Sequence, residues 1–335
     1  VPTFLMGGTL PVVLKRFADG GRALGRLAGI FYGLNTAGAV VGCLASGYWL
    51  LGAVGILRTT WIGAGLNLAV AAAAWFLGRG DEARGLRGEE EERSATAPAP
   101  PHERLVVRAV LAGAALSGFC ALAYEMLWTR MLNLFLNNNV YSFTAVLATF
   151  LTGIALGSLA YSALLSGARR PVLLFAAVQL GIALWGWATP FLFKLLQGPL
   201  FSRESAALTL GKTAAVMIVP TILMGVALPL AVQICRRGPH REGTTVGTVY
   251  AVNTVGSILG SFAAGFVLVP KLGLHGGLLL VVACNLLAAL LAVAAVARPA
   301  ARPAWALGTG APAAAAILAS PATLFRDLYE RAQPN

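Results

Sequence analysis

Long apolar runs separated by short polar stretches make up most of the chain. Eight runs exceed about 18 residues and carry almost no charge; they lie near 24–51, 54–77, 106–128, 139–165, 171–196, 206–234, 245–269 and 275–297. Each run predicts a membrane-spanning helix, because about 20 apolar residues cross a bilayer core of about 30 Å. An apolar stretch at 1–14 is too short to cross, and 303–319, which contains Pro303 and Pro312, is a weak candidate. We therefore expect an all-α polytopic membrane protein.

Composition and charge placement agree with this expectation. Hydrophobic residues make up 58% of the chain and charged residues 11%, with a mean hydropathy of +0.76, whereas soluble domains carry about 25% charged residues. The net charge of +12 could suggest nucleic acid, but Lys and Arg concentrate in alternate connections between the apolar runs. This asymmetry is typical of cytoplasmic loops at an anionic membrane surface. We therefore expect the lipid bilayer, and not nucleic acid, as the partner.

One segment of the chain resembles another. VPTFLMGGTLP at 1–11 recurs as VPTILMGVALP at 219–229, an offset of 218 residues from position 1 to position 219. The same offset relates Tyr32, Asn35, Thr36, Gly38, Gly42, Gly47, Gly55 and Asn67 to Tyr250, Asn253, Thr254, Gly256, Gly260, Gly265, Gly273 and Asn285. The repeat predicts a helical bundle that is present twice.

The repeat also predicts the domain organisation. Residues 105–298 form a complete six-helix bundle, and 1–77 form the C-terminal half of a first bundle whose N-terminal helices are missing from this sequence. Residues 78–104 are a polar cytoplasmic linker, and 299–335 are a weak extra helix and a tail. Two parallel six-helix bundles are the plan of major facilitator transporters. We therefore expect a major-facilitator-like helical bundle, truncated at its N-terminus, with the missing helices as partners.

Pairs of glycines lie four residues apart within the predicted helices. Small residues at this spacing let two helix backbones approach closely in a membrane. We expect a helix-packing role, and helix sliding during alternating access is the alternative. The pairs are Gly38 and Gly42, Gly153 and Gly157, and Gly256 and Gly260.

Two ionisable residues lie well inside predicted spans. Glu125 is near the outer end of its helix, and Lys212 is about seven residues into a helix that begins on the same side. The two can form an ion pair, and Arg130, five residues after Glu125, is the competing partner. The pair either fixes the packing of the bundle or binds a coupling ion or a cationic substrate.

Amides and aromatic residues complete the candidate intramembrane polar site. Asn35, Asn67, Asn253 and Asn285 either form hydrogen bonds between helices or line a cavity. Trp128, Trp185, Trp187 and Tyr141 lie near helix ends and fit an aromatic belt at the membrane surface.

Motifs for catalysis or metal binding do not occur in the sequence. There is no P-loop, HExxH or GxSxG, and no GxGxxG follows a predicted strand. The four cysteines contain no CxxC pair, and the histidines are dispersed. We predict no catalytic residue, metal or cofactor within this chain.

Three phrases carry a resemblance to a known family: YEMLWTR with the downstream NVYSFTAVLATFLTGIALGS, VPTILMGVALPL, and GTVYAVNTVGSILGSFAAGFVLVPKLGL. They resemble the membrane region of bacterial fused proteins that join a major-facilitator-like domain to a spermidine-synthase-like domain. The resemblance covers nearly all of 1–297 and implies the bacterial inner membrane. It also implies a C-terminal domain that binds decarboxylated S-adenosylmethionine and transfers aminopropyl to putrescine. No position of that domain can be matched here, because the sequence ends at LFRDLYERAQPN.

The resemblance favours one of three functions. The first is the membrane domain of a spermidine-synthase-like fusion protein, which anchors or serves aminopropyl transfer. The alternative is a major-facilitator-type transporter of a small solute, and a structural module is the third. Passage of a polycation should require several intramembrane carboxylates or an aromatic cage. Glu125 alone is available, which argues against polyamine transport.

Overall fold

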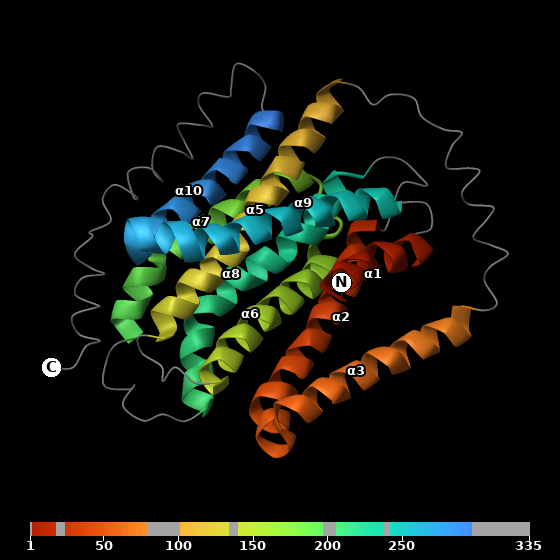
Figure 1. The fold of residues 1–335 in the computed structure, drawn as a ribbon. Coiled ribbons are helices and arrows are strands. Elements are labelled where there is room, and N and C mark those ends of the chain that lie inside the picture. Colours follow the sequence, from red (N-terminus) through yellow and green to blue (C-terminus); the bar gives the residue numbers. More distant parts are fainter. Residues whose placement is uncertain are drawn as a thin grey trace.

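The computed structural model describes residues 2–17, 24–78, 101–133, 140–196, 206–236 and 242–296, and every regular element within them is helical (Figure 1). Most of the predicted linker at 78–104 and the whole weak candidate at 303–319 lie outside these residues. The elements are α1 (Pro2–Phe17), α2 (Leu24–Ala45), η1 (Ser46–Leu50), α3 (Leu51–Gly78), α5 (Pro101–Asn133), α6 (Val140–Ala160), η2 (Tyr161–Leu165), α7 (Pro171–Leu196), α8 (Ala206–Ile234), α9 (Glu242–Ala263), η4 (Ala264–Leu268) and α10 (Val269–Val296). The three η elements are π-helical turns that continue α2, α6 and α9.

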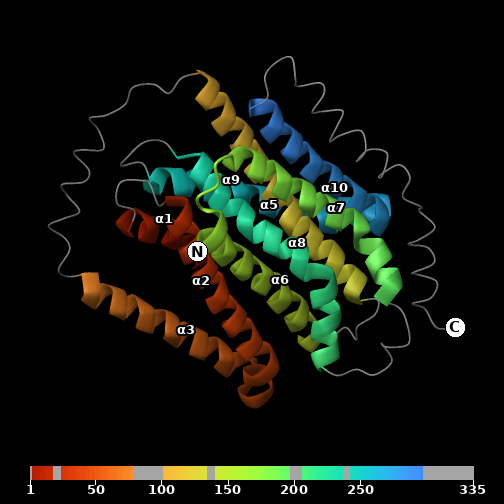
Figure 2. The same ribbon diagram turned by 180° about the vertical axis from the view of Figure 1, so that it is seen from behind.

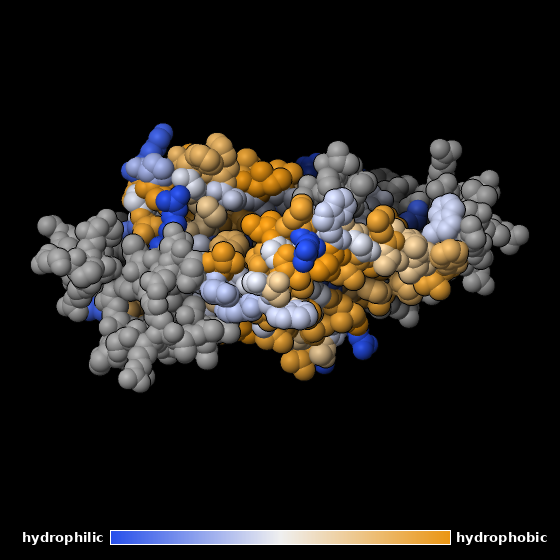
Figure 3. Space-filling view, turned by 60° about the horizontal axis from the view of Figure 1, so that its bottom comes forward, coloured by the Kyte–Doolittle hydropathy of each residue, from blue (hydrophilic) through white to orange (hydrophobic). Residues whose placement is uncertain are grey.

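Within the described residues, six helical stretches are long and apolar enough to cross a membrane. They are Leu24–Leu77, Glu103–Leu132, Val140–Leu165, Pro171–Leu195, Thr213–Ile234 and Glu242–Val296. The face shown in Figure 3 is largely apolar over the described helices. The prediction of an all-helical chain whose helices can insert into a membrane is therefore confirmed for this part of the chain.

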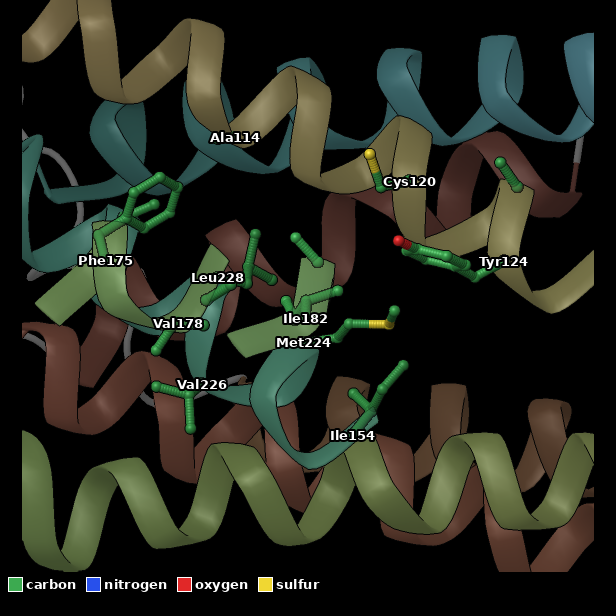
Figure 4. Close-up of a cluster of buried hydrophobic side chains, with 14 of the residues drawn as sticks. Ala114, Cys120, Tyr124, Ile154, Phe175, Val178, Ile182, Met224, Val226 and Leu228 are labelled. Atoms are coloured by element: carbon green, nitrogen blue, oxygen red, sulfur yellow. The ribbon is translucent and has the colours of Figure 1, made fainter. Parts of the chain in front are cut away.

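Helices α5 to α10 form one bundle around an apolar core. Helix α5 packs against α9 and α10, and α8 packs against α6 and α7. Helix α7 also packs against α10 (Figures 1 and 2). Side chains from α5, α6, α7 and α8 point into the shared interior, as Tyr124, Ile154, Ile182 and Met224 do in Figure 4. These six helices are the frame that positions the candidate site.

Glycines allow close contact at two of these interfaces. On α6, a β-carbon added to Gly157 would overlap the carbonyl oxygen of Ile222 on α8. On α9, a β-carbon added to Gly260 would overlap the carbonyl oxygen of Phe119 on α5. One turn earlier, Gly256 meets the carbonyl oxygen of Ala115 in the same way, and Gly153 meets the side chain of Thr221. The backbones approach closely at both interfaces because these four positions have no side chain.

The first three helices attach to this bundle unevenly. Helix α2 lies along α6 and also contacts α8, and α1 contacts α9. Helix α3 diverges from α2 and extends away from the bundle (Figures 1 and 2). Its side chains are mostly exposed, including Trp61, Leu68 and Trp75. Most of the long apolar surface of α3 is therefore left uncovered by the other described helices.

The segments 24–78 and 242–296 share unusual backbone features at matching positions. The π-helical turns at 46–50 and 264–268 are 218 residues apart. So are Gly55, with φ 76° and ψ 171°, and Gly273, with φ 71° and ψ 179°. Glycine alone adopts this backbone region without strain. Both segments therefore break at the same place, and the chain reverses direction there (Figure 1).

Candidate functional site

Helix α5 carries a buried tyrosine that joins it to α10 by a hydrogen bond. The ring of Tyr124 is fully buried and stacks on Trp128, with centroids 4.9 Å apart and planes at 14°. Its hydroxyl accepts a hydrogen bond from Nδ2 of Asn285 on α10 at 3.4 Å. Asn285 is fully buried as well. This pair joins α5 to α10 in the apolar interior, where unpaired polar groups are costly.

The carboxylate of Glu125 has no ionic partner within the described side chains. Glu125 is half-buried, and Arg130, the predicted competing partner, is exposed and forms no ion pair with it in this part of the chain. The side chain of Lys212 lies outside the described residues, although its backbone lies in α8, which contacts α5. An acidic group inside a membrane span is expensive, and usually binds a cation or a proton.

We expect Glu125→Gln to impair the full-length protein more than Arg130→Gln. Glutamine keeps the size of the side chain but removes the negative charge, and with it the binding of a cation or a proton at this position. Arg130 is exposed, and an exposed charge contributes less than about 1 kcal/mol to the free energy of unfolding. The measurements are activity in membranes and thermal stability in detergent. Equal tolerance of both changes would remove Glu125 from the site.

The other predicted amides occupy different environments. Asn253 on α9 is half-buried, and its carbonyl oxygen faces Gly118 on α5 and accepts a hydrogen bond from Ser257 at 3.0 Å. Asn35 on α2 and Asn67 on α3 are exposed. The structure therefore does not bring the four asparagines together. Of the four, Asn285 is the one whose side chain bonds to another helix in the described residues.

The site predicted from the sequence did not include two sets of buried polar residues. Gln179 on α7 is fully buried, and neither of its amide atoms has a partner among the described residues. Thr149 on α6 shares a hydrogen bond of 3.2 Å with Thr213 on α8.

Trp128 is fully buried, so its predicted place in an aromatic belt at the membrane surface is wrong. The reason is that α5 continues to Asn133 and keeps Trp128 inside the bundle.

Helix α2 is joined to α6 along its length. Near its start, Ser162 donates a hydrogen bond to the carbonyl oxygen of Arg26 at 3.0 Å. Near its other end, Tyr48 donates to the carbonyl oxygen of Tyr141 at 3.3 Å, and their rings stack. Gly29 lies between these points, where a β-carbon would overlap Ser162. Hydrogen bonds therefore close this contact at both ends.

A small cavity lies where α1 and α2 meet α8 and α9. Its lining includes three pairs of residues related by the offset of 218: Leu10 and Leu228, Ala28 and Val246, and Tyr32 and Tyr250. Pro229 and Val232 complete it. The described residues of the lining are apolar apart from the tyrosine hydroxyls and include no carboxylate. They offer no charge to a cation.

The described residues contain no cluster of three or more His, Cys, Asp or Glu that could hold a metal ion. None of the four cysteines takes part in a disulfide. The polar groups that the described helices present include carboxylates, amides, hydroxyls and thiols, together with His275 and several Lys and Arg residues.

Comparison with curated proteins finds distant homology to polyamine aminopropyltransferases. The chain is 29% identical to polyamine aminopropyltransferase 2 of Streptomyces coelicolor over 232 residues, which are 67% of this chain and 40% of that protein. It is 26% identical to polyamine aminopropyltransferase 1 of the same organism over 212 residues, which are 61% of this chain and 38% of that protein. The chain thus spans about two fifths of the length of these relatives. No protein-family model matches the chain, and no solved structure matches it.

Proposed function

We propose that this chain is the membrane-embedded part of a spermidine-synthase-like protein and that it anchors or serves aminopropyl transfer to polyamines. The observation that carries the proposal is the length of the match to the two aminopropyltransferases, 232 and 212 residues. A match of either length must include residues of the described helices, because fewer than 212 residues of the chain lie outside those helices. The similarity therefore includes residues of the apolar helices, which supports a membrane-embedded part shared with these relatives.

The proposal places the chain in the bacterial inner membrane and assigns the chemistry to a fused domain outside residues 1–335. That domain would bind decarboxylated S-adenosylmethionine, as the resemblance of the sequence implies. The described helices would hold it at the cytoplasmic face, where Lys and Arg concentrate. The matching breaks at Gly55 and Gly273 support a major-facilitator-like plan of two related bundles.

Two features support anchoring over solute transport. Transporters of this class bind their substrate near the midplane between the two halves, and alternate by moving one half against the other. The cavity between α1, α2, α8 and α9 is small, and no carboxylate is among the described residues that line it. The contact between α2 and α6 is closed by hydrogen bonds near both of its ends. Alternating access would require one of these ends to open.

The test is aminopropyl transfer by membranes that contain the product of the full gene. Membranes are incubated with decarboxylated S-adenosylmethionine and labelled putrescine. We expect labelled spermidine, and we expect this activity to sediment with the membranes, because the helices hold the catalytic domain there. Membranes from cells without the gene are the control.

Two results would contradict the proposal. If sealed vesicles accumulate labelled putrescine or another solute without converting it, the result favours the alternative function, a transporter of a small solute. If spermidine forms only in the soluble fraction while the helices remain in the membrane, the two parts do not work together. Either outcome leaves the helical fold unaffected.

A further inference from the structure

The matched segments 24–78 and 242–296 pack very differently. In the second segment, α9 and α10 both lie against α5. Gly256 and Gly260 meet the carbonyl groups of Ala115 and Phe119 on α5, and Asn285 bonds to the hydroxyl of Tyr124. This face of α9 and α10 is therefore a receptor surface for one helix, α5.

The same face of the first segment is open. A β-carbon at Gly38 or Gly42, the counterparts of Gly256 and Gly260, would meet nothing within 4 Å. Leu68 is 72% exposed where its counterpart Leu286 is 8% exposed. Asn67 is exposed where its counterpart Asn285 is fully buried. The residues that receive α5 in one segment are thus present but uncovered in the other.

Lipid alone is a poor cover for this face. The amide of Asn67 would have to lie against hydrocarbon chains without a hydrogen-bond partner, which is costly. A groove made by two glycines one turn apart is filled well by another helix backbone. Both features therefore favour a protein helix as the occupant.

We propose that the open face of α2 and α3 binds a further membrane-spanning helix of the same polypeptide, from outside residues 1–335. The occupant matches α5 in chemistry: backbone carbonyl groups lie opposite Gly38 and Gly42, as those of Ala115 and Phe119 lie opposite Gly256 and Gly260, and a hydroxyl or other acceptor lies opposite Asn67. A second copy of the chain does not fit, because its own α9 and α10 already cover its α5. The relatives are long enough to hold further helices, since this chain spans 40% and 38% of them. The proposal depends on the membrane location and not on aminopropyl transfer.

The test is site-specific photo-cross-linking in membranes that contain the product of the full gene. A benzophenone side chain is placed at position 67, and the cross-linked peptides are identified by mass spectrometry. We expect a cross-link within one polypeptide, from α3 to an apolar helix outside residues 1–335. The matched control is position 62 on the opposite side of α3. Its counterpart Leu280 is 36% exposed on the surface of the bundle, so position 62 should label lipid.

A second variant tests the glycine groove. Gly42→Leu is expected to leave the described fold intact, because a β-carbon at this position meets nothing within 4 Å. It should lower the cross-linking yield at position 67 about tenfold, the change that about 1.4 kcal/mol produces. Lipid adducts alone at position 67, cross-links between two differently tagged copies, or a yield that Gly42→Leu does not change would each overturn the proposal. Loss of aminopropyl transfer without loss of the cross-link would affect only the proposed function.

Discussion

Replacing Gly260 by alanine is expected to destabilise the 335-residue chain severely. A β-carbon there would overlap the carbonyl oxygen of Phe119 and lie 2.7 Å from its carbonyl carbon. These are backbone atoms of α5, so relief requires α5 and α9 to move apart. Overpacking of this kind costs about 1–3 kcal/mol and occasionally more. We expect a loss of the monodisperse species in detergent, or a large fall in its unfolding temperature.

The matched control is Gly42→Ala, at the position that corresponds to Gly260 in the other segment. No atom lies within 4 Å of a β-carbon there, and alanine is favoured over glycine in a helix by about 0.8–1.0 kcal/mol. We therefore expect an unchanged or slightly higher unfolding temperature. Equal effects of the two replacements would show that the contact between α5 and α9 is not as close as described.

The two replacements are expected to have different effects in the 335-residue chain and in a longer polypeptide. If a further helix lies on α2, Gly42→Ala becomes as disruptive as Gly260→Ala once that helix is present. The sign of the Gly42 effect would then depend on the length of the chain that is expressed. This dependence follows from packing alone, because helix propensity is the same in both chains.

The pattern of apolar runs was sufficient to predict the helices and their breaks. The predicted gap between 269 and 275 contains Gly273, at which α10 breaks, and the break at Gly55 lies close to the predicted start at 54. These features can be predicted because they depend on local residue types. The length of an apolar run predicts a membrane-spanning helix, and a glycine permits the positive φ at a break. The glycine pairs at 153 and 157, and at 256 and 260, were also expected at close helix contacts.

The burial and the contacts of individual residues could not be predicted from the sequence in the same way. Gly38 and Gly42 have the same spacing as Gly256 and Gly260, yet one pair is open and the other is in contact with α5. Nothing in the apolar run around Tyr124 indicated that its hydroxyl accepts a hydrogen bond from Asn285 on α10. Burial depends on which helix lies opposite a face, and a repeat in sequence does not specify that neighbour.

Replacing Gln179 by leucine is expected to stabilise the protein, which is unusual for a substitution at a fully buried position. Neither atom of its amide has a hydrogen-bond partner among the described residues. An unpaired buried polar group costs about 1–3 kcal/mol, and an apolar side chain of similar size removes this penalty. We therefore expect a higher unfolding temperature for Gln179→Leu in detergent.

Gln233→Leu is the control, because Gln233 is a half-buried amide whose nitrogen and oxygen both form hydrogen bonds. Its Nε2 donates to the carbonyl oxygen of Ser166 at 3.1 Å, and its Oε1 accepts from the hydroxyl of Tyr161. The same replacement should therefore lower the unfolding temperature. A loss of stability at both positions would mean that Gln179 has a partner, such as an internal water. A gain in stability at Gln179 with a loss of activity in the full gene product would instead mark this amide as a binding group, because a polar group kept unpaired at a cost to stability is retained for function.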